Sequence, residues 1–141
     1  MKKYLIDGYN LLHAWKKEHV FNSKTFDGMR EELIRSLQML ADFKDIAIEV
    51  YFDGKIRSKD KIEGSPHFKV IFTSKEITAD TAIERAVYNA ESKKELTVIT
   101  SDRKIRDLAM ALGVLSLNPM HFLADLKEAK KEISKLLTLK K

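Results

Sequence analysis

Short apolar runs alternate with longer amphipathic stretches along the whole chain. Runs rich in β-branched and aromatic residues predict five strands, at residues 3–7, 46–52, 68–73, 96–100 and 114–117. Apolar residues at helical spacing predict helices over 24–42 and 78–93, a short helix that stops at Gly113, and a final helix from 118 onward. Strands and helices that alternate in this way predict an α/β domain, with a parallel sheet covered by helices on both faces.

Polar residues indicate where the helices begin and where the loops lie. The expected helix caps are Ser23, either Ser101 or Asp102, and Asn118. Residues 53–67 are polar and rich in lysine, which predicts a loop. No element is predicted between the first strand and residue 24.

Composition narrows the class of protein. The 141 residues suit one domain spanning 1–141, and no apolar run approaches the roughly 20 residues that span a bilayer. An acid at position 7 interrupts any signal-peptide core, and the chain has no cysteine, which suits a cytoplasmic protein and leaves oxygen ligands as the main metal donors. The net charge of +5 favours anionic partners only modestly.

Three predicted strands end in an aspartate. Asp7 ends the first strand, Asp53 the second, and Asp102 follows the fourth. In open parallel sheets, ligands bind beyond the carboxyl ends of the strands, where the strand order reverses. We therefore expect these carboxylates at one edge of the sheet.

Asp80 and Glu84 add two more carboxylates at the start of the helix before the fourth strand. At i and i+4 they share a helix face, where like charges repel by roughly 0.2–0.5 kcal/mol. A divalent cation such as Mg²⁺ or Mn²⁺ would reverse that repulsion. Phosphodiester hydrolysis commonly uses such a site, because the metal neutralises phosphate charge and lowers the pKa of a bound water.

Each polar residue also has a purely structural interpretation. Asp7 can form an Asx turn, Asp53-Gly54 a turn, and Asp102 a helix cap, while Thr81-x-x-Glu84 fits a capping box. Asn10 either caps the chain or orients Asp7 or a phosphate. Thr100 and Ser101 either cap a helix or hold a metal-bound water. We interpret Trp15 and Phe21 as packing residues rather than base-stacking ones.

The motifs "LIDGYNLLHAW", "VIFTSKEITADTAIER" and "VITSD", in this order, resemble the NYN domain of the PIN-like nuclease superfamily, and most closely its YacP-like group. The resemblance implies a three-layer fold with a five-stranded parallel sheet in the order 3-2-1-4-5. It implies a metal-dependent ribonuclease in which Asp7, Asp80 and Asp102 bind the metal with support from Asn10. Glu84 and Asp53 are further candidate ligands.

The resemblance also suggests partners. Single-stranded RNA, in particular messenger RNA cut in association with the ribosome, is the expected substrate. Basic residues near the carboxyl edge are candidates for its phosphate track: Lys55, Arg57, Lys59, Lys61, Arg103, Lys104 and Arg106. The run from 127 to 141 predicts an amphipathic packing helix, or alternatively a helix that pairs with a partner subunit, so we expect a monomer or weak homodimer.

Two other functions remain open on sequence grounds. One is a non-catalytic RNA-binding module with the same fold, which the retained acids disfavour. The other is a metal-dependent phosphatase acting on small nucleotides, which the lysine-rich loop weakly disfavours.

Overall fold

The computed structural model describes residues 1–54, 63–74 and 76–139. They form a six-stranded sheet in the order β3-β4-β2-β1-β5-β6. The strands are β1 Lys3–Asp7, β2 Ala47–Phe52, β3 Glu63–Ser65, β4 Phe68–Phe72, β5 Leu96–Ile99 and β6 Leu115–Leu117. All pairings are parallel except that of β3 with β4. When β1, β2, β4, β5 and β6 are numbered one to five along the chain, their order across the sheet is 3-2-1-4-5, as expected.

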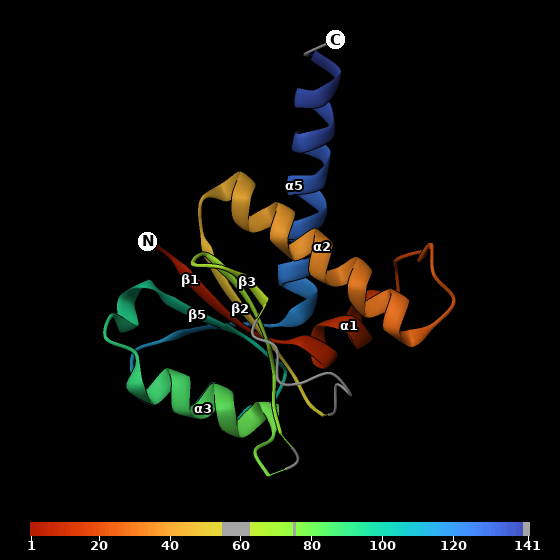
Figure 1. The fold of residues 1–141 in the computed structure, drawn as a ribbon. Helices are drawn as coiled ribbons and strands as arrows, with labels where there is room; N and C mark the ends of the chain where they lie inside the picture. Colours follow the sequence, from red (N-terminus) through yellow and green to blue (C-terminus); the bar gives the residue numbers. More distant parts are fainter. Residues whose placement is uncertain (55–62, 75, 140–141) are drawn as a thin grey trace.

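Helices cover both faces of the sheet (Figure 1). They are α1 Gly8–Lys16, α2 Phe26–Lys44, α3 Ala79–Asn89, α4 Arg103–Ala111 and α5 Pro119–Leu139. The core on one face unites side chains of α1, α2 and α5 with alternate residues of the strands, such as Ile6 and Phe52. The other core unites α3 and α4 with the intervening strand residues, such as Leu5 and Tyr51. This alternation follows from the period-two geometry of strands.

Three elements were not predicted. The helix expected over 78–93 ends at Asn89, and a short 3₁₀ helix, η1, follows it at Lys93–Glu95. The other two elements lie elsewhere in the chain. Residues 8–16 form α1, which follows β1 without a linking residue. Its buried residues Leu11, Leu12 and Trp15 pack in the core, which confirms the packing role expected for Trp15. The third is β3, which falls inside the segment predicted as a loop and pairs antiparallel with the edge strand β4.

The structure identifies the caps of three helices. Two of them differ from the sequence predictions, and the third decides between two predicted candidates. Thr25, not Ser23, caps α2, because its hydroxyl accepts the Gly28 N–H at 3.0 Å. Thr78 caps α3 through the Thr81 N–H, so the predicted capping box from Thr81 to Glu84 is wrong. Asp102 caps α4, and Ser101 precedes the cap.

The final helix, α5, packs on the rest of the molecule along only part of its length, whereas a packing helix was expected over 127–141. Phe122, Leu123 and Leu126 are buried against the body of the molecule. The end of α5 extends beyond it, and Leu137 and Leu139 are exposed there (Figure 1). Across the described ranges, we find no helix with the length and apolarity that a membrane crossing requires.

Gly8 at the start of α1 is required by packing rather than by flexibility. A Cβ built on Gly8 would lie 2.3 Å from a ring carbon of Phe52, whose side chain is fully buried. We expect Gly8→Ala to lower the free energy of unfolding by about 1–3 kcal/mol, as overpacking does. Urea denaturation should measure this loss, and the same substitution should cost less in a Phe52→Leu background. An equal cost in both backgrounds would contradict the steric explanation.

Candidate active site at the carboxyl edge of the sheet

Asp7 is placed at this edge by the junction of β1 with α1. It is the last residue of β1 and the N-cap of α1, and its Oδ1 accepts the Asn10 N–H at 3.3 Å. β1 lies at the centre of the sheet, between β2 and β5. The side chain of Asp7 is half-buried at the point where the strand order reverses.

Asp53 brings the start of α3 to the same edge. It follows β2, and its Oδ1 accepts the Ala79 N–H at 2.6 Å. The Thr78 hydroxyl completes the helix start by accepting the Thr81 N–H. Asp80, the second residue of α3, is thereby held next to Asp7. Asp53 thus caps a helix 26 residues away, a role that was not among the local turn and metal-ligand roles considered from sequence.

Burial and neighbouring carboxylates raise the pKa values of Asp7 and Asp80. The pKa of Asp7 is raised from its ordinary value of 3.8 to about 7. Burial is the main cause, the Asn10 N–H opposes the rise, and the charges of Asp80 and Asp53 add to it. Burial also raises the pKa of Asp80, and the charge of Asp102 adds to that rise. Asp80 therefore interacts electrostatically with both Asp7 and Asp102.

Asp102 is fixed by the loop between β5 and α4. Its N–H donates to the buried Thr100 hydroxyl at 3.0 Å, and its Oδ1 accepts the Ile105 N–H at 3.2 Å. The neighbouring Ser101 exchanges two hydrogen bonds with Asn10: the Asn10 amide donates to the Ser101 Oγ at 2.7 Å, and its Oδ1 accepts the Ser101 N–H at 2.8 Å.

Asn10 thus joins the start of α1 to the start of α4. The sequence left open whether Asn10 caps the chain or whether its side-chain amide orients Asp7 or contacts a phosphate. The structure instead places that amide on Ser101, and only the backbone N–H of Asn10 contacts Asp7. The two residues are 91 positions apart, so no local pattern could reveal the pair.

The remaining predicted site residues divide into two groups. Among the described acids, Glu84 is not one of the charges that act on Asp7 or Asp80. Arg103, Lys104 and Arg106 are exposed on the first turns of α4, close in sequence to Asp102. The other group, Lys55, Arg57, Lys59 and Lys61, lies outside the described residues.

The donor set fits a hard divalent cation. Asp7, Asp80 and Asp102 supply carboxylate oxygens, the ligands that Mg²⁺ and Mn²⁺ prefer. Within the described ranges, none of them forms an ion pair with a lysine or arginine. In those same ranges, no group of three acids or histidines is arranged to hold one ion. The neighbouring pairs of carboxylates are the arrangement on which a metal site could be built.

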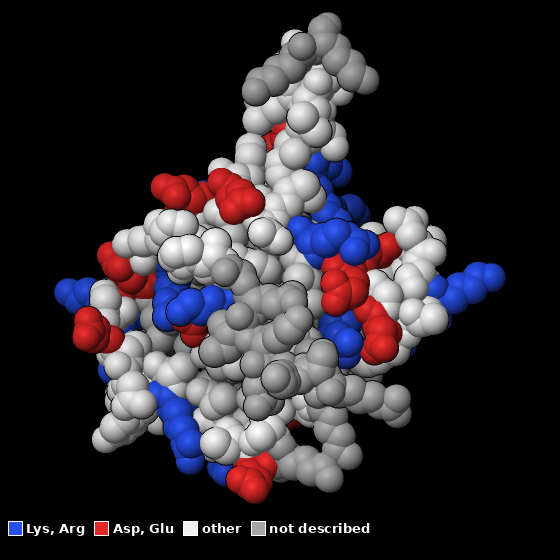
Figure 2. All heavy atoms as spheres, viewed as in Figure 1, with Lys and Arg blue, Asp and Glu red and all other residues white. Residues whose placement is uncertain are grey.

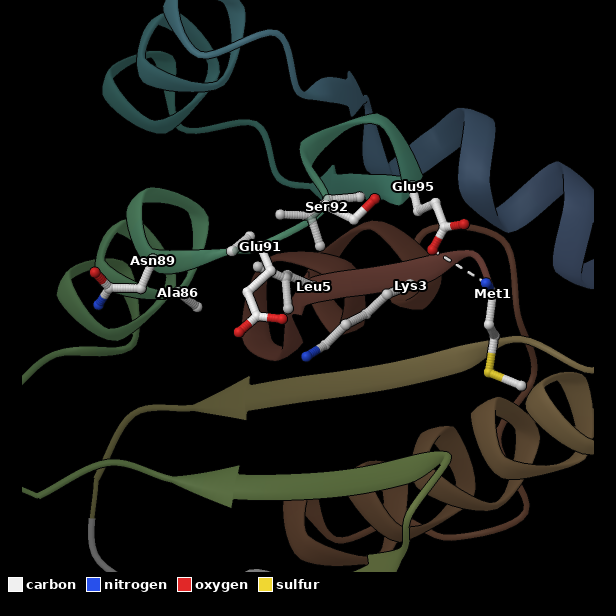
Figure 3. Close-up of a pocket in the computed structure, with 10 residues that line it drawn as sticks. Met1, Lys3, Leu5, Ala86, Asn89, Glu91, Ser92 and Glu95 are labelled. Atoms are coloured by element: carbon white, nitrogen blue, oxygen red, sulfur yellow. Dashed lines mark hydrogen bonds and ion pairs between the residues drawn. The ribbon is translucent and has the colours of Figure 1, made fainter.

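A cavity of about 410 Å³ at the opposite edge of the sheet offers no comparable chemistry (Figure 3). Its charged groups are largely paired: the N-terminal amine lies 3.0 Å from Glu95, and Lys3 lies 2.6 Å from Glu49. Among the described residues on the face shown in Figure 2, acidic and basic side chains are interspersed rather than gathered into one basic patch. The acidic edge is therefore the candidate site.

The chain gathers aspartates at the edge where the strand order of its sheet reverses. It belongs to the nuclease superfamily that contains the NYN domains. Within that class the chain belongs to the YacP-like NYN domain family, whose model matches residues 4–141. It is similar to YacP of Bacillus subtilis (strain 168), with 24% identity over 133 residues that cover 93% of this chain and 78% of YacP.

Two solved structures share the fold. A crystal structure of Rae1 (YacP) from Bacillus subtilis superposes with a TM-score of 0.77 at 23% identity, covering 98% of this chain and 80% of that one. A crystal structure of a single-site mutant of the same protein gives a TM-score of 0.74 at 25% identity, covering 96% of this chain and 80% of that one.

Proposed function

We propose that this chain is a single-domain, metal-dependent endoribonuclease that cleaves single-stranded RNA at the carboxyl edge of its sheet. The observation that carries the proposal is the row of interacting carboxylates Asp7, Asp80 and Asp102, whose mutual repulsion and burial raise the pKa values of the first two. Such a concentration of negative charge is unfavourable for folding, so a functional reason for it is expected.

The three aspartates would hold Mg²⁺ or Mn²⁺. A bound divalent cation neutralises phosphate charge and lowers the pKa of a water molecule, so that water can attack phosphorus. Asp53 and the Thr78 hydroxyl hold the start of α3 so that Asp80 stays beside Asp7. The Asn10–Ser101 pair fixes the distance between the α1 and α4 starts, and with it the separation of Asp7 and Asp102.

The residues around the acids favour a polymer over a small nucleotide. Arg103, Lys104 and Arg106 are exposed at the start of α4, where the helix dipole disfavours positive charge. Three cations in that position are explained by phosphates that approach from solvent. We propose that they contact the RNA backbone next to the scissile phosphate.

We expect the protein to cut a labelled single-stranded RNA internally in the presence of Mn²⁺, without ribosomes, and to leave 5′-phosphate and 3′-hydroxyl ends. Those ends follow from attack by water with the 3′ oxygen as leaving group. EDTA should abolish the reaction, and a DNA strand of the same sequence and free nucleotides serve as competing substrates. Gel analysis of the products and their ends measures the outcome.

Each rival has its own result in this experiment. If the protein binds the RNA but does not cut it in Mn²⁺ or in Mg²⁺, the protein is a binding module. Release of inorganic phosphate from nucleotides, with the RNA left intact, would indicate a phosphatase.

A further inference from the structure

An aromatic pair lies beside the acidic edge, on the face of the sheet opposite α3. Tyr9, two residues after Asp7, stacks on Phe26 with ring centroids 5.4 Å apart and 24° between the ring planes. The Tyr9 ring also makes an edge-to-face contact with the Phe52 ring, with the centroids 4.9 Å apart. Phe52 in turn immediately precedes Asp53, so the pair is continuous with the carboxylate site. We call Tyr9 and Phe26 the aromatic platform.

Phe26 is the accessible member of the platform. From its helical spacing it belongs to the apolar stripe of α2 that includes Leu33 and Leu37, yet it is 44% exposed while those two are fully buried. Its position as the first residue of α2 places it past the edge of the core. Tyr9 stacks on one face of its ring, and the exposure of the residue gives a further stacking partner access from solvent.

Arg30 holds the platform in place. Its Nη1 donates to the Tyr9 hydroxyl at 3.2 Å, and its Nη2 lies 3.2 Å from the Asp27 carboxylate. The guanidinium also lies over the Phe72 ring, 5.4 Å from its centroid. Tyr9 is thus fixed both by packing and by a hydrogen bond, so the ring that backs Phe26 is ordered before any ligand arrives. Such preorganisation reduces the entropy lost on binding.

We propose that the aromatic platform stacks an unpaired nucleobase of the RNA substrate, with Phe26 as the contact residue and Arg30 as a positioning residue. This inference rests on the proposed function and names how the same site takes its substrate. Stacking on an aromatic ring tolerates any sequence, because every base has a π face. It selects single strands, because a paired base is already stacked in its helix.

The position of the platform favours this use over simple packing. Among the described residues, the exposed aromatic side chains are Phe26 and Tyr88. Tyr88 lies near the end of α3, so that helix separates it from the acidic edge at which α3 begins. Phe26 stacks directly on Tyr9, which follows Asp7 by two residues, so the platform adjoins the carboxylates and one RNA strand could occupy both.

The test compares two oligomers of equal length and charge, a single-stranded RNA and a sugar-phosphate oligomer without bases. Phe26→Ala should weaken binding of the RNA by between about fivefold and about a hundredfold, the range for loss of one base–aromatic stack. Binding of the baseless oligomer should change less than about twofold, since phosphate contacts are kept. Fluorescence anisotropy at constant salt measures both affinities.

Three further variants isolate stacking from folding. Phe26→Leu keeps apolar bulk and should lose the same affinity as Phe26→Ala, whereas Phe26→Trp should retain wild-type affinity. Tyr88→Ala, the matched exposed aromatic, should bind both oligomers like the wild type. Equal weakening on both oligomers, or no weakening by either Phe26→Ala or Phe26→Leu, would overturn the platform and leave the nuclease proposal standing. Failure of the wild type to bind RNA at all would overturn both.

Discussion

Replacing Asp7 by asparagine is expected to lower the rate of RNA cleavage by at least about a hundredfold, because the stabilisation that a metal ion supplies is worth several kcal/mol. The amide has the shape of the carboxylate and can still accept the Asn10 N–H, so the start of α1 should be preserved. What it lacks is the charge that holds a cation. Single-turnover cleavage of labelled RNA in Mn²⁺ measures the loss.

The matched control is Asp107→Asn, the same chemical change at an exposed position on α4. It should cleave at the wild-type rate. Affinity of Asp7→Asn for RNA, measured in parallel, should remain close to that of the wild type, because the basic residues and the aromatic platform are untouched. Cleavage by Asp7→Asn at near the wild-type rate would show that the metal does not depend on this carboxylate.

The sheet and its acidic edge could be predicted because both depend on local patterns. Each strand is a short apolar run, and an aspartate at its end is visible in the sequence without knowing what it contacts. The α/β alternation then brings those strand ends to one edge, whatever the details of packing. Asp7, Asp53 and Asp102 were placed correctly at the edge on this basis alone.

The missed features depend on contacts between distant residues. Gly8 suggested a turn after β1, but it is the first residue of α1, and its missing side chain makes room for the Phe52 ring. Ser23 and Thr25 are equivalent as hydroxyl caps, and only the backbone path decides between them.

The same limit applies within the site. Asp53 accepts the N–H of Ala79, the first residue of a helix that begins 26 residues later, and Asn10 pairs with Ser101, 91 residues away. Phe26 was misassigned for a different reason. Its spacing assigned it to the buried stripe of α2, but its position at the start of the helix leaves it exposed. Periodicity identifies a face of a helix, but it does not show how far along the helix the core extends.

The unfavourable charge at the site predicts an unusual pH dependence of stability. In EDTA, the wild-type free energy of unfolding should fall by up to about 3 kcal/mol between pH 4.5 and 8.5, relative to Asp7→Asn. The pKa of Asp7 is about 7 in the folded protein and 3.8 ordinarily, so the folded state binds the proton more tightly. The stability it contributes is complete below pH 3.8 and is lost as the pH rises through 7.

Asparagine imitates protonated Asp7 and does not titrate, so the variant should not undergo this loss of stability as the pH rises. Subtracting the two curves removes the contributions of titrating groups that do not interact with Asp7, and the difference reports Asp7 together with its partner Asp80. Urea denaturation at a series of pH values gives each point. Asp107→Asn should follow the wild-type curve. A difference between wild type and Asp7→Asn that stays constant with pH would show that Asp7 does not titrate in this range.

A divalent cation should restore the stability that the protein loses as the pH rises. At pH 8, Mg²⁺ or Mn²⁺ is expected to raise the melting temperature of the wild type, because an ion that binds only the folded state stabilises it by mass action. The effect should increase with metal concentration and disappear when Asp80→Asn and Asp102→Asn are combined. Those two substitutions should also leave the metal-free stability little changed or higher, since they remove repulsion around Asp80. A metal-free loss of several kcal/mol would instead mean that these aspartates act mainly as structural caps, as the hydrogen bond from the Ile105 N–H to Asp102 permits.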